Sequence, residues 1–222
     1  MAIVLPVLYI TVLYGAFMAG LIRVRTENSS IISSTEPADF ISNPPWATLS
    51  LFVAIGIPTT LQFFFPYILT LFRRDTVAFL AGDWWRIITP LFVQDGGVSG
   101  SIFNLVSLLI VGSIAERLWG SRRWLILFFL GGVLCEMISL AWQPVGAGNS
   151  GANFALAGSI AIRCLTRHPL RLERLLASAI LASGLLLLAL HDIHGAAAAF
   201  GVVIALVPIW LEDRKLQAGL RC

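Results

Sequence analysis

Long, uninterrupted apolar stretches are the feature that most restricts how this chain can fold. There are seven, at roughly residues 2–22, 48–72, 102–118, 124–142, 149–165, 175–190 and 194–211. A helix of about 20 apolar residues crosses the hydrocarbon core of a bilayer, whereas a β-barrel strand would alternate apolar and polar residues. These stretches are continuous, so the sequence predicts an all-α, polytopic membrane helical bundle.

The composition agrees with a chain that lies in lipid. Hydrophobic residues make up 58% and charged residues only 12%, where a soluble domain carries about 25% charged residues. The formal net charge of +3 is therefore interpreted as a signal of membrane orientation and not of nucleic-acid binding. Cys135, Cys164 and Cys222 show no metal-ligand spacing. We expect the lipid bilayer as a partner, and neither a metal nor a cofactor.

The basic residues are distributed unevenly between the two sides of the predicted bundle. If the N-terminus is outside and the C-terminus inside, only three of the 15 Lys and Arg residues, Arg73, Arg74 and Arg86, fall outside. Loops on the cytoplasmic side are enriched in Lys and Arg. The sequence therefore predicts a multi-pass protein of the cell membrane with an outside N-terminus and a cytoplasmic C-terminus.

Three polar residues share one depth in this topology. Asn104, Ser150 and His194 lie at the outer ends of the third, fifth and seventh spans, all of which run from outside to inside. A serine, a histidine and an asparagine together supply a nucleophile, its base and an oxyanion donor. The alternative interpretation of Ser150 is a small polar residue that only fills space between helices.

Small residues follow both Ser150 and His194 at helical spacing. They are Gly151, Ala155 and Gly158 on the fifth span, and Ala197, Ala198, Gly201 and Ala205 on the seventh. Small residues spaced in this way let membrane helices approach closely. The pattern predicts contact between the two spans, and it favours His194 over His191 as the base because His194 begins the stripe.

Four motifs, in matching order, resemble the rhomboid family of intramembrane serine proteases. They are WWRIITPLF, NLVSLLIVGSIAERLWG, GNSGANFALAG and HGAAAAFG, and the resemblance covers about residues 48–212. It implies a six-helix core, preceded here by one extra transmembrane helix. We accordingly divide the chain into an N-terminal anchor and linker (1–46), a protease core (47–213) and a short inside tail (214–222).

The resemblance also implies roles for individual residues. Ser150 would be the nucleophile and His194 the general base, forming a dyad without an Asp. Asn104 and the backbone N–H of Ser150 would bind the oxyanion, with Gly148 and Gly151 flanking the nucleophile in the substrate-binding part of the site. The expected reaction is hydrolysis of peptide bonds in or near the transmembrane segments of membrane-protein substrates.

One position departs from the family pattern and keeps an alternative open. Gly100 stands where relatives often have a histidine, four residues before Asn104. Either the oxyanion hole has two donors, which we favour, or Gln94, Ser99 or Ser101 supplies another. The change also leaves open a catalytically weak or inactive rhomboid-like protein that binds membrane-protein clients. A transporter is disfavoured because the chain shows no internal repeat.

Three acidic residues remain, and each has a structural interpretation. Asp192 is interpreted as a loop residue, too close in sequence to His194 to orient it. Glu136 lies inside the fourth span, where a carboxylate is a candidate for a functional role; the favoured interpretation is a proton-bearing or hydrogen-bonded group within the bundle. Glu116, with Arg117 at the inner end of the third span, is expected to be structural because it lies on the opposite side from the predicted dyad.

Overall fold

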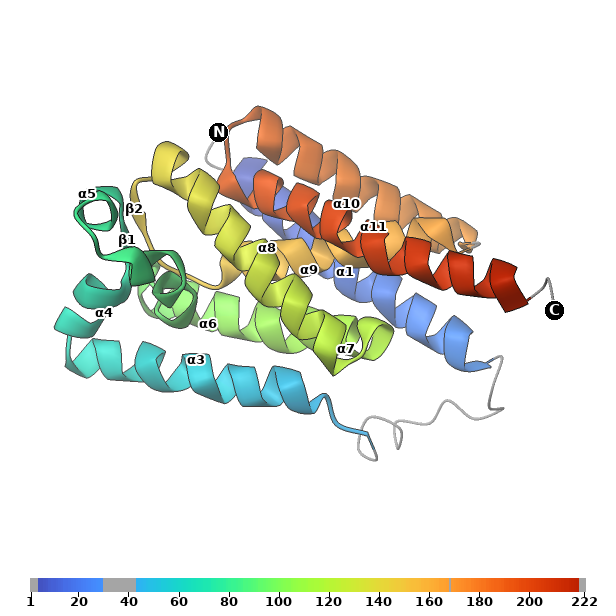
Figure 1. Ribbon diagram of the computed structural model, residues 1–222, viewed down its shortest axis with the longest axis horizontal. Helices are drawn as coiled ribbons and strands as arrows, with labels where there is room; N and C mark the ends of the chain where they lie inside the picture. The colour runs from blue at the N-terminus through green and yellow to red at the C-terminus, as the bar shows by residue number, and fades with distance from the viewer. Residues whose placement is uncertain (1–3, 30–42, 168, 220–222) are drawn as a thin grey trace.

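The structure is a computed structural model that describes residues 4–29, 43–167 and 169–219. Its main helices are α1 (Val4–Ser29), α3 (Trp46–Phe64), α6 (Gly97–Ser107), α7 (Ser113–Trp119), α8 (Ser121–Trp142), α9 (Ser150–Thr166), α10 (Arg171–Ala189) and α11 (Ile193–Gly219). A π-helical turn, η3 (Leu108–Gly112), joins α6 to α7. The helices lie side by side (Figure 1), which confirms the predicted all-α bundle. The predicted linker falls largely on residues 30–42, outside the described residues.

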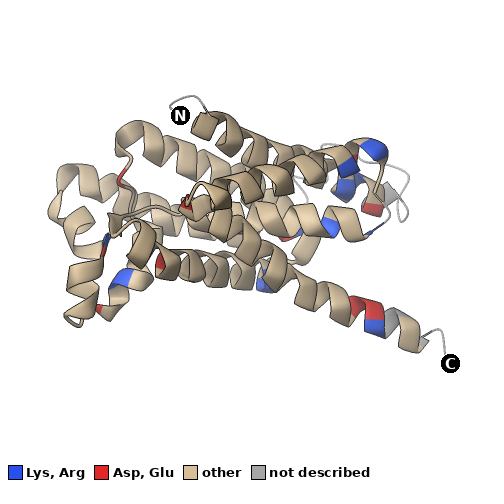
Figure 2. Cartoon of the chain, turned by 90° about the horizontal axis from the view of Figure 1, so that it is seen from above, with Lys and Arg blue, Asp and Glu red and all other residues tan. Residues whose placement is uncertain are grey.

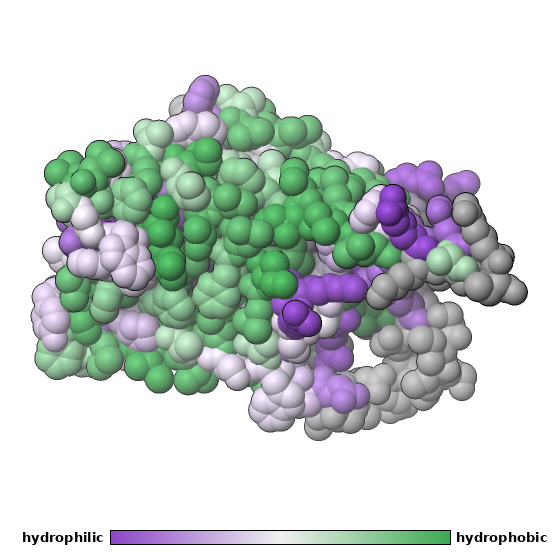
Figure 3. All heavy atoms as spheres, in the orientation of Figure 1, coloured by the Kyte–Doolittle hydropathy of each residue, from purple (hydrophilic) through white to green (hydrophobic). Residues whose placement is uncertain are grey.

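Six helical segments in the described part of the chain are long and apolar enough to cross a membrane. They are Val4–Glu27, Trp46–Phe64, Gly97–Trp119, Ser121–Trp142, Arg171–Ala189 and Ile193–Arg214. The fifth predicted span, residues 149–165, corresponds to α9, which has 17 residues and is buried along most of its length inside the bundle. The visible surface is apolar along the helices, and hydrophilic residues gather towards one end (Figure 3). The chain is therefore a multi-pass membrane protein.

The second predicted span, residues 48–72, is interrupted. α3 ends at Phe64, and α4 (Tyr67–Phe72) begins only after Pro66. Proline disfavours the helical conformation in the residue before it and lacks the N–H that would continue the helix. Phe65 accordingly leaves the helical region, with φ −128° and ψ 80°. The expectation of one continuous helix was wrong at this point.

The insertion between α3 and α6 folds into short elements beside the bundle. After α4 these are β1 (Arg74–Asp75), α5 (Thr76–Leu80), η1 (Trp84–Ile87) and η2 (Thr89–Phe92). β1 pairs antiparallel with β2 (Val145–Gly146), with Arg74 opposite Gly146. The Asp95 carboxylate also accepts the N–H of Ala147. The insertion is thus tied to the segment that leads into α9.

The packing of α9 against α11 brings the two backbones into direct contact. A Cβ on Gly158 would overlap the backbone of Ala198, and a Cβ on Gly201 would overlap the backbone of Ala155. Each glycine therefore faces the other helix, as small residues do where membrane helices pack closely. The predicted contact between the two small-residue faces is confirmed.

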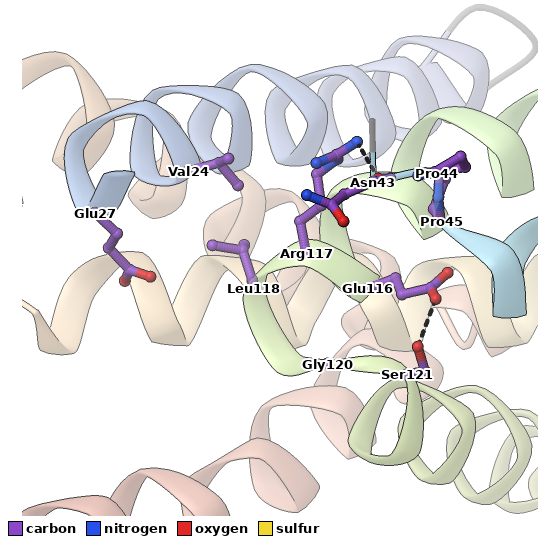
Figure 4. Close-up of a pocket in the computed structure, with 10 residues that line it drawn as sticks. All are labelled: Val24, Glu27, Asn43, Pro44, Pro45, Glu116, Arg117, Leu118, Gly120 and Ser121. Carbon is purple, nitrogen blue, oxygen red and sulfur yellow. Dashed lines mark hydrogen bonds between the residues drawn. The ribbon is translucent and has the colours of Figure 1, made fainter. Parts of the chain in front are cut away.

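Glu116 holds three helices together at the end of α7. Its buried carboxylate accepts the N–H groups of Ala47 and Thr48 at the start of α3, and also the hydroxyls of Thr48 and Ser121. Ser121 begins α8. A cavity of about 290 Å³ lies beside it, lined by residues of α1, α7 and the segment that leads into α3 (Figure 4). The predicted structural role of Glu116 is confirmed by these bonds.

We expect Gly201→Ala to destabilise the protein, because the new methyl group overlaps the Ala155 backbone. Overpacking of this kind typically costs about 1–3 kcal/mol. Gly56→Ala on α3 is the matched control, since a Cβ there meets no atom within 4 Å. Thermal unfolding in detergent measures both variants. Equal midpoints for the two would contradict the close approach of α9 and α11.

Candidate active site

Ser150 is the first residue of α9 and follows a turn that requires glycine. Gly148 has a φ of +150°, a conformation that residues with a side chain rarely adopt. A Cβ at this position would lie 3.1 Å from the side-chain nitrogen of Asn104 and 3.7 Å from the Ser150 hydroxyl. Gly148 therefore keeps open the space between the serine and the asparagine.

His194, the second residue of α11, lies directly against this serine. The distance from His194 Nε2 to Ser150 Oγ is 2.9 Å, and both side chains are partly buried. The contact is made where α9 and α11 begin, a few residues before their glycine contacts. The structure thus brings together the two side chains that the sequence analysis paired, while their chemical roles stay a prediction.

Asp192 completes a chain of contacts that the sequence analysis did not foresee. Its Oδ1 lies 2.7 Å from His194 Nδ1 and also accepts the backbone N–H of His194 at 2.9 Å. The residue does lie in the turn before α11, as expected. The interpretation that this turn residue is too close in sequence to orient His194 was wrong. A carboxylate at a helix N-terminus folds back onto the first N–H groups, and here the imidazole lies within the same reach.

The contact with Asp192 determines which nitrogen of His194 carries the proton. Burial alone would raise the pKa of Asp192, but hydrogen bonds from His194 and Tyr9 hold that pKa below its ordinary value. The carboxyl is therefore ionised at neutral pH and can only accept hydrogen bonds. Nδ1 of His194 must then be the donor, which in the neutral ring leaves Nε2 to accept the Ser150 hydroxyl.

Two aromatic rings flank the His194 imidazole. Its centroid lies 4.6 Å from the Phe154 ring of α9 and 4.8 Å from the Tyr9 ring of α1. His191 lies elsewhere, exposed and 5.4 Å from the Trp142 ring. Of the two histidines that the sequence analysis weighed, His194 is thus the one next to Ser150.

Asn104 is held by hydrogen bonds through both its side chain and its backbone carbonyl. Its side-chain Nδ2 donates to Gln94 Oε1 at 2.7 Å, and its backbone carbonyl accepts Asn153 Nδ2 at 3.0 Å. The Nδ2 group carries two N–H bonds, one of which is used by Gln94. Nδ2 also lies 3.1 Å from the position that a Cβ of Gly148 would take, so it stands beside the space that Gly148 keeps open.

Gln94 orients Asn104 from a fully buried position. Its Nε2 donates to Asn149 Oδ1 at 2.9 Å, and its backbone exchanges two hydrogen bonds with the side chain of Gln62. With its nitrogen on Asn149, Gln94 presents an acceptor towards Asn104. Of the three residues considered as replacement donors, Gln94 contacts Asn104, and it does so as an acceptor.

A cavity of about 180 Å³ opens beside Ser150 and His194, and a buried ion pair lies on its wall. The pair is formed by Arg74, from the insertion, and Glu136, from α8; both side chains are almost fully buried. Arg74 Nε also donates to the carbonyl of Gln143. This confirms that Glu136 is hydrogen-bonded inside the bundle. Buried charges persist only when paired in this way.

Gly151 lines the same cavity and also packs α9 against α8. A Cβ at Gly151 would lie 2.6 Å from the sulfur of Cys135. The sequence analysis placed this glycine both beside the nucleophile and in the small-residue stripe expected to face the seventh span. Its packing partner is instead Cys135 of α8.

Tyr9 is a neighbour of the site for which the sequence carries no signal. Its hydroxyl donates to Asp192 across 183 positions of the chain. No local pattern encodes a contact of that separation. The signal for Asp192 was present, because its position two residues before His194 fits an N-terminal capping turn.

The fold and the site together define a narrow class of proteins. The chain is a membrane helical bundle in which a serine and a histidine are in contact beside a polar cavity. The model of the Rhomboid domain matches residues 81–214, more than half of the chain. The chain belongs to the rhomboid family. It is a multi-pass member of a family of intramembrane proteases.

Similarity to individual relatives supports this assignment. Over 150 residues the chain is 31% identical to the rhomboid protease GluP of Bacillus subtilis, covering 63% of this chain but 29% of GluP. Over 155 residues it is 30% identical to YdcA of the same organism, also named for the rhomboid family, covering 66% of this chain and 72% of YdcA. The rhomboid protease AarA of Providencia stuartii is 30% identical over 71 residues, 32% of this chain and 25% of AarA.

Proposed function

We propose that this chain is an intramembrane serine endopeptidase that hydrolyses peptide bonds in or near the transmembrane segments of membrane-protein substrates. The observation that carries the proposal is the 2.9 Å contact between Ser150 Oγ and His194 Nε2 at the ends of two close-packed membrane helices. Ser150 is the nucleophile and His194 is the general base. The named proteases GluP and AarA support the same class of activity.

The reaction follows from this geometry in two halves. His194 Nε2 takes the proton of the Ser150 hydroxyl as Oγ attacks the scissile carbonyl carbon. The tetrahedral intermediate then collapses, and the imidazolium returns the proton to the leaving amine. Water next attacks the acyl-serine and gives a proton to His194, and the imidazolium returns that proton to Ser150 Oγ as the acyl group leaves, which regenerates both the hydroxyl and the neutral imidazole. Asp192 keeps the proton on Nδ1 throughout, so that Nε2 is the basic nitrogen.

The oxyanion is stabilised by two donors in this proposal. Asn104 Nδ2 is one, and the N–H of Ser150 is the other, because the first N–H groups of a helix have no partner within it. The positive end of the α9 dipole adds to their effect. Gln94 holds the Asn104 amide in place, so that little reorganisation accompanies the appearance of charge.

The substrate must present an extended backbone at the cavity. Peptide groups within a helix are hydrogen-bonded to one another and closed to attack, so a helix-weakening neighbourhood is needed at the cut. The cavity beside Ser150 is only about 180 Å³, which favours small residues at the cut. The polar wall formed by Arg74 and Glu136 makes the cavity a suitable place for the hydrolytic water.

We further propose that the N-terminus lies outside and the C-terminus in the cytoplasm. Lys and Arg residues lie mostly towards the end of the bundle that carries the C-terminus (Figure 2). The positive-inside rule makes that end cytoplasmic. Ser150 and His194 then lie in the outer half of the membrane.

We expect Ser150→Ala to abolish both labelling by a fluorophosphonate and cleavage of a model transmembrane substrate, because the nucleophile is lost. His194→Ala should be inactive, whereas His191→Ala, the matched control on the neighbouring turn, should keep substantial activity. Labelling and cleavage in detergent measure all three. Wild-type cleavage by Ser150→Ala would exclude the proposed mechanism, and an unlabelled wild type would favour a client-binding, inactive protein.

Removing the side-chain oxyanion donor should be severe in a two-donor site. We expect Asn104→Ala to lower kcat by about 10²–10³, the usual effect of losing one donor. Gly100→His should raise kcat with little change in KM, and a Cβ at Gly100 meets no atom within 4 Å, so the backbone accepts the first side-chain atom without overlap. Initial rates on one substrate test both variants. An Asn104→Ala variant with full activity would remove Asn104 from the mechanism.

The orientation is tested with single cysteines in a variant that lacks Cys135 and Cys164. Cys222, which is outside the described residues, should react with a membrane-impermeant maleimide only after cells are permeabilised. Gln143→Cys, with Cys222 also replaced, is the matched control; Gln143 is exposed and directly follows α8, so it should react on intact cells. The reverse pattern would overturn the orientation.

A further inference from the structure

The first helix is an integral part of the bundle although it lies outside residues 81–214, which match the family model. α1 packs against α9, α10 and α7. The residues on its packed face are fully buried: Val12, Ala16 and Ala19. A Cβ on Gly20 would overlap Ile114 of α7. α1 therefore has a fixed position relative to the helices that carry the site.

A buried arginine anchors α1 at its inner end. Arg23 Nε donates to Glu173 of α10 at 2.5 Å, and its other nitrogens donate to the carbonyls of Arg167 and Cys164. Both charged side chains are almost completely buried, where a charge is tolerated only with full pairing. This anchor fixes the helix along its axis and in rotation.

At its other end, α1 contributes Tyr9 to the catalytic chain of contacts. The hydroxyl of Tyr9 donates to Asp192 Oδ2 at 2.5 Å, a length typical of a charge-assisted bond between a hydroxyl and a carboxylate. The other oxygen, Oδ1, accepts both the Nδ1 and the backbone N–H of His194. Each carboxylate oxygen is thus held by a different partner, and the carboxylate cannot rotate without breaking both sets of bonds.

The ring of Tyr9 makes a second contact, directly with the base. Its centroid lies 4.8 Å from that of His194 and 5.4 Å from that of Phe154, edge to face. The imidazole therefore lies between a ring from α9 and a ring from α1. The Tyr9 ring therefore limits the position of the His194 imidazole, and the Tyr9 hydroxyl limits the position of the Asp192 carboxylate.

We propose that Tyr9 is a positioning residue of the active site, which holds Asp192 in the orientation that keeps His194 directed at Ser150. This inference rests on the proposed function, in which His194 is the base. It makes the extra helix a functional part of the enzyme and not merely an anchor. Tyr9 acts through Asp192, so its hydroxyl should matter only while Asp192 is present.

The test is the rate at which a fluorophosphonate labels Ser150, measured as kinact and KI, together with the thermal midpoint. We expect Tyr9→Phe, which removes only the hydroxyl, to lower kinact by about tenfold, as loss of one hydrogen bond to a charged group does. KI and the thermal midpoint should stay close to wild type. Tyr14→Phe on the same helix, where the side chain is 61% exposed, is the matched control and should label at the wild-type rate.

A double-mutant cycle separates positioning from packing. In an Asp192→Ala background, adding Tyr9→Phe should cause no further loss of kinact. A tenfold loss in that background too, or a wild-type kinact for Tyr9→Phe alone, would overturn the role of Tyr9 while the proposed function stands. A wild-type protein that is not labelled at Ser150 would instead overturn the proposed function, and this inference with it.

Discussion

The contact between the backbones of α9 and α11 is the constraint on which the site depends. Two glycines, Gly158 and Gly201, allow the helices to approach until main chain meets main chain. Ser150 and His194 have short side chains, and they stand at the ends of these two helices. A wider separation of the axes would leave the hydroxyl and the imidazole out of reach of each other. The contact between the hydroxyl and the imidazole is therefore set by glycines that lie outside the site.

Two buried ion pairs organise the polar interior in the described part of the bundle. Arg74 with Glu136, and Arg23 with Glu173, are buried pairs that also bind backbone carbonyls. In a protein surrounded by lipid, an unpaired charge cannot turn to bulk water. The pairs consequently hold the elements that they connect in place: the first lies on the wall of the cavity beside Ser150, and the second fixes α1. Polar groups around the site thus stabilise its geometry.

The sequence alone predicted much of the fold, because apolar length and helical spacing are local properties. It also paired Ser150 with His194, since both begin small-residue stripes at one depth. It did not predict the parts of the site that depend on exact backbone geometry or on distant contacts. Asp192 reaches His194 only because of the turn before α11, and Gln94, at the end of the insertion, meets Asn104 only through the way the chain turns into α6. The break at Pro66 was missed because the hydrophobicity on either side is continuous.

Because the chain is synthesised from its N-terminus, the position of α11 near the end of the sequence determines when the site can form. Tyr9 and Asp192 are 183 residues apart, and Ser150 precedes His194 by 44. With synthesis in this direction, Ser150 and the face of α9 that carries Gly158 are made before α11. Only α11 brings the imidazole to the serine, and the turn before it brings Asp192 to Tyr9. These contacts therefore form only after most of the bundle has been synthesised.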